Sequence, residues 1–272
     1  MVGSKSGSFQ QLITAVFFWL GERLRDLFMW PTNLVRDFPI RIGRLLGTMV
    51  RGLDAILFFV PELLDAIRHR ETIGWLRYKV ALLFDWLHQF FTQIFDLCGG
   101  PEILEFLMHL MTKTTALSGD EVAMISAILG PDAMRYGDVR VVEGGIFDLI
   151  FKLNGNLAFA TWHSINLPQT GRHTRENGSI VVHELTHVYQ YERVGTRYLG
   201  EAIYMLIKTK RDCYNYGGSN GLSEACLAGQ KYRHFNREQQ AMITQDYYSR
   251  CEKGLDVSTY ETFIAQVRIG EI

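Results

Sequence analysis

Residues 180–192, IVVHELTHVYQYE, constrain the fold of this chain more than any other segment. His183 and His187 stand four residues apart, so on a helix both imidazoles leave the same face. Most other positions of the segment's first half are apolar, namely Ile180, Val181, Val182, Leu185 and Val188. This composition predicts a buried helix, and burying its polar groups without partners would be costly. A surface helix with two ordinary histidines is the alternative interpretation.

The His-Glu-x-x-His spacing is typical of a zinc site. Zinc binds imidazole nitrogens, and a catalytic zinc ion uses three protein ligands and leaves the fourth position to water. Glu184 follows the first histidine, where it can accept a proton from that water. We therefore predict Zn²⁺ as the cofactor, His183 and His187 as two of its ligands, and Glu184 as the catalytic residue.

The third ligand must come from another part of the chain. The residues after His187 read VYQYERVG, which excludes the extended motif that supplies a third histidine. The candidates are glutamates of later helices: Glu201, Glu224 and Glu238. We favour Glu238, because Ala241 follows in the same helix and a small residue lets two helices approach closely. Alternatively, Glu238 is a first-turn carboxylate that complements the helix dipole.

Residues 113–272 alternate between strand and helix patterns. Ser118 and Glu121 form a capping-box pattern at the start of a helix. We expect helices over 118–130, from about 179, and over about 198–209 and 236–250, and strands over 138–145 and 157–168. Strands followed by helices indicate an α+β domain.

Residues 1–112 have a different composition. They hold twelve of the 17 phenylalanines and four of the five tryptophans, but one of the 12 tyrosines. Apolar residues recur at helical spacing through 11–29 and 82–97, which predicts a mostly α-helical, amphipathic region. We expect four prolines to divide it into four or five helices: Pro31, Pro39, Pro61 and Pro101. A linker over 112–118 should separate the two halves.

Every cation from Arg23 to Arg51 is an arginine. A basic segment rich in Trp and Phe is typical of a helix that lies in the headgroup region of an anionic membrane. The alternatives are a bundle that packs these rings into its own core or against the second half, which we favour, and a surface for a partner protein. No apolar run is long enough to span a bilayer, and 12–20 lacks the cleavage site of a signal peptide. The net charge of −1 gives no reason to expect nucleic-acid binding.

The segment HELTHVYQYE, with INLP before it and YNYGG and FNREQQAMITQDYY after it, resembles the bacterial Vgr-related, zincin-like metallopeptidases. These proteins are encoded near Rhs and secretion-system genes, and the resemblance covers roughly 115–250. It implies a zincin-like domain of the gluzincin type, with His183, His187 and Glu238 as zinc ligands and Glu184 as the general base. The strand over 157–167 would be the edge strand beside the active helix, where a peptide substrate can pair with it.

Peptide hydrolysis also needs a hydrogen-bond donor to stabilise the oxyanion of the intermediate. The candidates are Tyr214, Tyr216, His234 and Tyr247. Trp162, His163 and Asn166 could reach the cleft, but we favour the interpretation that each is a strand residue with no catalytic task. We predict a zinc-dependent metallopeptidase that acts on a peptide or protein. It would work in the bacterial cytoplasm, on a membrane surface or as a secreted effector, without a cleavable signal peptide. The alternative is a membrane-interacting or secretion-apparatus scaffold protein with a structural or vestigial zinc site.

Overall fold

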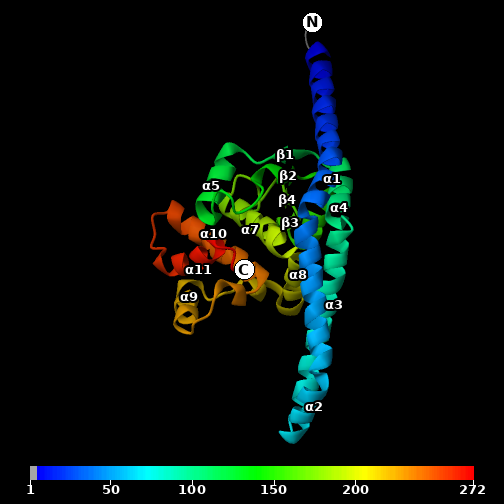
Figure 1. Cartoon of the computed structure of the whole chain (residues 1–272). Coiled ribbons are helices and arrows are strands. Elements are labelled where there is room, and N and C mark those ends of the chain that lie inside the picture. Colours follow the sequence, from blue (N-terminus) through cyan, green and yellow to red (C-terminus); the bar gives the residue numbers. More distant parts are fainter. Residues whose placement is uncertain (1–4) are drawn as a thin grey trace.

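The computed structural model describes residues 5–272, which are mostly helical with one small mixed sheet (Figure 1). The predicted combination of helices with a small sheet is thus confirmed. The helices are α1 (Lys5–Leu57), α2 (Phe59–Arg68), α3 (Thr72–Leu97), α4 (Gly100–Leu110), α5 (Gly119–Leu129), α6 (Asp148–Asn154), α7 (Gly178–Val194), α8 (Arg197–Thr209), α9 (Gly218–Leu227), α10 (Arg237–Glu252) and α11 (Ser258–Arg268). The strands are β1 (Thr114–Ala116), β2 (Arg140–Glu143), β3 (Phe159–Thr161) and β4 (Ser164–Leu167).

Helices α1 to α4 form a long rod along one side of the molecule. Figure 1 shows that the N-terminal end of α1 and the α2 end of the rod both project beyond the rest of the protein. The expectation that Pro31 and Pro39 end helices is wrong, because both lie inside the 53-residue α1. Packing of α1 against α3 and α4 offsets the missing hydrogen bonds. Pro61 and Pro101 do lie in the first turns of α2 and α4, where a helix tolerates proline.

The interior of the rod is polar. Ala66 and Pro101 are the apolar side chains of the described first half that are buried. The buried polar side chains are Arg23, Arg41, Thr48, Gln89, Gln93, Asp96, Glu102, His109 and Thr112. The rings were expected to pack into a core of this half or against the second half. Rings such as Phe17, Phe28 and Phe84 are exposed instead, whereas Phe95 packs beside Trp162 of the second half.

The sheet has the strand order β1-β2-β4-β3. Strand β4 pairs parallel with β2, and the two outer pairs are antiparallel. The single strand expected over 157–168 is instead the hairpin of β3 and β4, which turns at Trp162 in a left-handed conformation (φ 48°). Strand β3 is at the edge of the sheet and β4 lies inside it. The expected linker over 112–118 contains the other edge strand, β1.

Helix α7 forms the centre of the main core. Its apolar side chains pack with the sheet and with α5 and α10; core residues include Val181, Leu185, Val188, Ile165, Leu167 and Ile243. The predicted capping box before α5 is confirmed: Ser118 Oγ accepts a hydrogen bond from Glu121 N at 3.1 Å, and Ser118 N donates to Glu121 Oε2 at 2.7 Å. The predicted helices near 179, 198–209 and 236–250 are α7, α8 and α10.

Polar contacts join the rod to the second half. The buried Asp96 of α3 accepts hydrogen bonds from the backbone N–H of Thr196, at 3.0 Å, and from its hydroxyl. Arg44 of α1 donates to the carbonyl oxygens of Glu192 and Arg193 at the end of α7. The rod therefore packs directly against the end of the helix that carries the histidines. Within the described residues, no helix has the length and apolar character needed to cross a membrane.

Candidate metal centre

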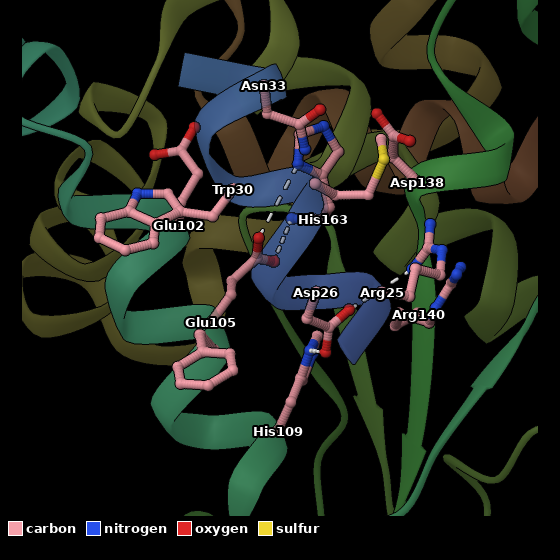
Figure 2. Close-up of a pocket in the computed structure, with 12 residues that line it drawn as sticks. Arg25, Asp26, Trp30, Asn33, Glu102, Glu105, His109, Asp138, Arg140 and His163 are labelled. Carbon is pink, nitrogen blue, oxygen red and sulfur yellow. Dashed lines mark hydrogen bonds and ion pairs between the residues drawn. The ribbon is translucent and has the colours of Figure 1, made fainter. Parts of the chain in front are cut away.

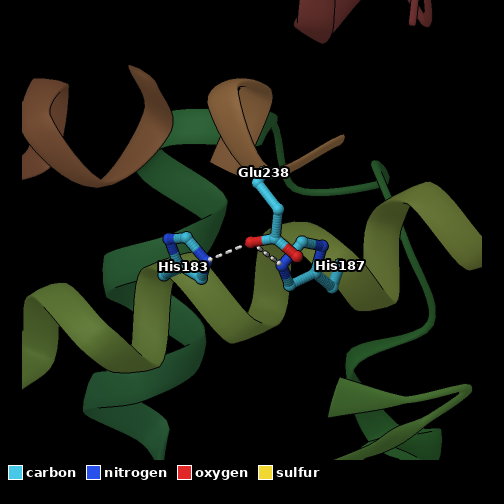
Figure 3. Close-up of side chains that lie close together, drawn as sticks. All are labelled: His183, His187 and Glu238. Carbon is cyan, nitrogen blue, oxygen red and sulfur yellow. Dashed lines mark hydrogen bonds and ion pairs between the residues drawn. The ribbon is translucent and has the colours of Figure 1, made fainter. Parts of the chain in front are cut away.

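Three side chains from α7 and α10 meet at one point (Figure 3). His183 and His187 lie one turn apart on α7, and their ring centroids are 5.0 Å apart. Glu238 comes from the first turn of α10, and its Oε2 lies 3.3 Å from His183 Nε2 and 3.4 Å from His187 Nε2. All three residues are buried, and one ligand atom from each lies within 4.8 Å of the others. This group could hold a metal ion.

A second set of side chains orients His187. Gln190, three residues further along α7, has its Oε1 atom 2.8 Å from His187 Nδ1. When Nδ1 donates this hydrogen bond, Nε2 is the ring nitrogen that faces Glu238, and it can bind a metal ion once it has lost its proton. Gln190 Nε2 in turn donates to Gln240 Oε1 and to the carbonyl oxygen of Arg237, both at 3.0 Å. The network thus fixes the ligand helix α7 against α10.

Charges within the group stabilise one another in the absence of metal. Burial lowers the pKa of His187, but the Glu238 carboxylate outweighs burial and raises this pKa to about 9. Burial raises the pKa of Glu238, and the two imidazoles reverse this effect and hold it well below its usual range. Glu238 is therefore an ionised carboxylate, which is the form that binds a cation.

Glu184 lies next to the group without belonging to it. Its side chain is buried, and its Oε2 atom has no hydrogen-bond partner within the described residues. Burial raises the pKa of Glu184, and the nearby histidines oppose the shift. A buried carboxylate oxygen without a partner is costly unless water or a ligand satisfies it. Glu184 can therefore interact with a molecule that reaches the metal position.

The donor set fits a divalent cation such as zinc. Two imidazole nitrogens and one carboxylate are typical ligands of zinc, and such a three-residue set leaves a position for water. Across residues 5–272, no fourth His, Cys, Asp or Glu joins the group. A structural zinc site would usually have four protein ligands.

The other two glutamates proposed as ligands lie elsewhere. Glu201 pairs with Arg197 and with Arg237, the latter at 2.6 Å. Glu224 is exposed on α9. Ala241 is fully buried where α10 packs on α7, which agrees with the reason for preferring Glu238.

Three of the four oxyanion candidates are engaged away from the metal group. The Tyr216 hydroxyl donates to Asp246, the Tyr247 hydroxyl donates to Glu261, and His234 Nδ1 accepts a hydrogen bond from Lys231 N. Tyr214 does lie beside the group: its ring centroid is 6.1 Å from that of His183. Burial, followed by the charge of Glu238, raises the pKa of the Tyr214 phenol, so it remains a proton donor.

Trp162, His163 and Asn166 do not line the metal group. Trp162 packs beside Tyr191 and Tyr198, and the amide of Asn166 donates to the Phe159 carbonyl within the hairpin. His163 points into a polar pocket between α1, α4 and the β3–β4 turn (Figure 2).

In this pocket the His163 backbone N–H donates to Glu105 Oε1 at 2.7 Å, and its Nε2 lies 3.0 Å from Glu192 Oε1. Burial lowers the pKa of His163, but the two carboxylates outweigh it and raise the pKa. The two carboxylates thus favour the protonated form of the imidazole, which links the rod to the end of α7.

Sequence reasoning missed two residues that position His187. Gln190 could have been found, because a residue three positions after a ligand shares its helical face. Tyr198 stacks on the His187 ring, with centroids 6.1 Å apart, and its hydroxyl donates to the Ala160 carbonyl of β3 at 3.1 Å. No local pattern indicates this second contact, because α8 reaches His187 only through the fold.

No protein-family model, curated protein or solved structure matches this chain.

Proposed function

We propose that this protein is a zinc-dependent metallopeptidase whose active site is built on α7 and α10. The observation that carries the proposal is the convergence of His183, His187 and Glu238, with the unpartnered carboxylate oxygen of Glu184 beside them. The three-residue donor set and the adjacent base are the two parts that zinc hydrolysis requires.

Each residue has a defined task in this proposal. A bound zinc ion would lower the pKa of water and polarise a carbonyl group. Glu184 accepts the proton of that water and can pass it to the leaving nitrogen. The Tyr214 hydroxyl, near His183, is suited to donate a hydrogen bond to the oxyanion.

An extended peptide is the substrate that the surrounding structure favours. Strand β3 is an edge strand that packs against α7, so a peptide that displaces the Tyr198 hydroxyl from the Ala160 carbonyl can pair with it. The hydroxyl of Tyr198 connects this strand to the ring that stacks on His187. A peptide bound along β3 would therefore be held beside the metal group.

Metal analysis of four variants tests the site. The wild-type chain should bind one equivalent of zinc, whereas His187→Ala and Glu238→Gln should lose it. Glu184→Gln should keep the metal and lose hydrolysis of a casein or mixed-peptide substrate by at least about a hundredfold. Glu224→Gln is the matched control, because this glutamate is exposed and lies outside the group. Hydrolysis that persists in Glu184→Gln would exclude this residue as the base.

A further inference from the structure

One face of α1 is apolar and exposed along almost the whole helix. Its exposed members are Ile13, Phe17, Leu20, Leu24, Phe28, Val35, Phe38, Leu46, Met49, Leu53 and Ile56, which we call the apolar stripe. At 3.6 residues per turn these positions fall within an arc of about 80° and extend over about 65 Å. No charged residue of α1 falls within this arc. Phe28 and Val35 are 70% and 74% exposed.

The other side of the same helix carries the polar groups. Arg23 and Arg41 are buried, and Arg41 pairs with the buried Glu102 of α4. Helix α3 repeats this arrangement, with Gln89, Gln93 and Asp96 buried while Leu83, Phe84 and Phe91 are exposed. Polar groups inside and apolar groups outside are the reverse of a water-soluble bundle, and they suit a helix that contacts lipid.

The spacing of the stripe favours a flat partner. Ile13, Leu24, Val35, Leu46 and Leu57 recur every eleven residues, and all are exposed. This period, about 3.7 residues per turn, is close to the 3.6 of the helix, so the stripe winds around α1 only slowly and with a right-handed sense. A left-handed coiled coil between two copies of α1 would need a repeat of 3.5 residues. A planar surface can contact a stripe that stays within an arc of about 80° over its full length.

The charges beside the stripe favour an anionic surface. Most acidic residues of α1 are turned toward the rest of the protein: Glu22 pairs with Arg140, Asp26 with His109 and Asp37 with Arg135. Asp54 is the exposed acid. The cations nearest to the stripe are Arg25 and Arg36, whose side chains are 30% and 40% exposed. The exposed charge along this side of α1 is therefore mainly positive, which attracts anionic headgroups.

We propose that α1 lies flat on an anionic lipid bilayer, with the apolar stripe in the boundary between headgroups and acyl chains. The helix does not cross the bilayer in this arrangement, and the flanking arginines contact lipid phosphates. The inference goes beyond the proposed peptidase activity, because the stripe lies on α1 whereas the metal group lies on α7 and α10.

Vesicle flotation of the full-length chain tests this proposal. Phosphatidylcholine vesicles that contain about 30% phosphatidylglycerol provide an anionic surface. They should carry the wild-type protein upward at low salt. The triple variant Leu24→Gln, Phe28→Gln and Val35→Gln should remain at the bottom, with partitioning reduced roughly tenfold for each side chain lost. Arg25→Gln with Arg36→Gln should weaken binding to anionic vesicles about fivefold per arginine and leave binding to pure phosphatidylcholine unchanged.

The matched control is a second triple variant, Leu153→Gln, Ile207→Gln and Leu227→Gln, in α6, α8 and α9. These side chains are 79%, 78% and 90% exposed but lie outside the rod, so this variant should float like the wild type. Flotation of the stripe variant, or failure of the wild type to float, would overturn the proposal. A wild-type dimer that the stripe substitutions convert to a monomer, without flotation, would assign the stripe to a second copy instead. Glu184→Gln should float normally, so failure of the peptidase proposal remains distinguishable.

Discussion

At the scale of single residues, His187 is the most constrained member of the metal group. Gln190 holds its Nδ1 atom and Tyr198 stacks on its ring, while Nε2 faces Glu238. A ring held in this way has little freedom to lose when a metal binds, which favours binding. His183 has no such support within the described residues, because its Nδ1 is buried without a partner.

We therefore predict that Gln190→Ala weakens zinc binding by about 10- to 100-fold, because His187 loses the acceptor that fixes its tautomer. Competition with a chelating zinc indicator would measure the affinity. Gln190→Glu restores an acceptor oxygen and should recover most of it. Equal affinities of the wild type and Gln190→Ala would show that packing alone orients the ring.

His163 should make stability depend on pH. Its folded-state pKa is raised, so its contribution is complete below its ordinary value of 6.5 and is lost as pH rises through the raised value. The pKa of Glu192 is lowered from 4.5, despite burial, by its hydrogen bond and charge interaction with His163, so its contribution is lost only in stronger acid. Both groups are charged between about pH 4.5 and about pH 6.5, the ordinary pKa values of glutamate and histidine. In this range His163→Gln should lower the unfolding free energy by about 3 kcal/mol.

Urea unfolding at about pH 5.5 and about pH 9, which lie below and above the ordinary histidine pKa, would test this. The loss caused by His163→Gln should shrink at the alkaline pH. His69→Gln is the control, because this histidine is exposed. A loss that does not change with pH would mean that His163 contributes by packing rather than by charge.

At the scale of elements, α1 continues through two prolines because its packing against α3 and α4 outweighs the hydrogen bonds that the prolines remove. Proline is about 3 kcal/mol less favourable than alanine inside a helix. Pro39 is exposed in the middle of α1, so its replacement removes little packing. We predict that Pro39→Ala raises the unfolding free energy by up to about 3 kcal/mol, measured by urea unfolding.

Pro61→Ala is the matched control for this prediction. Pro61 is also exposed, but it lies in the first turn of α2, where a backbone N–H has no helical partner. Its replacement should change stability by much less. A destabilised Pro39→Ala variant would show instead that the bend imposed by proline is needed to seat α1 against the other helices.

At the scale of the whole molecule, the two halves meet through buried polar groups. Asp96 reaches Thr196, and Arg44 reaches the end of α7, so separation of the halves would leave these groups without partners. We predict that residues 1–112 and 113–272 unfold in a single transition.

The uneven distribution of aromatic residues provides the measurement. Tryptophan fluorescence reports mainly on residues 1–112, and tyrosine absorbance reports mainly on 113–272. Their urea midpoints should coincide, and Asp96→Ala should lower both. Midpoints that separate would show that the halves fold independently, as the division of the sequence predicts.

Much of the second half could be predicted from the sequence because its signals are local. The four-residue spacing in α7 places two imidazoles on one face, and Ser118 with Glu121 marks the start of α5. Glu238 was favoured for a local reason as well, since Ala241 allows α10 to approach α7. In each case, covalent spacing and helix geometry were enough.

Only the tertiary structure decided which face of each helix is covered. Periodicity shows that Gln89, Gln93 and Asp96 share a face, but it cannot show that this polar face of α3 is the buried one. The same holds for Tyr198 and Tyr214, which reach the two histidines from other elements. Spacing along the chain determines which side chains lie together on one element, whereas burial depends on what the remaining elements bring against it.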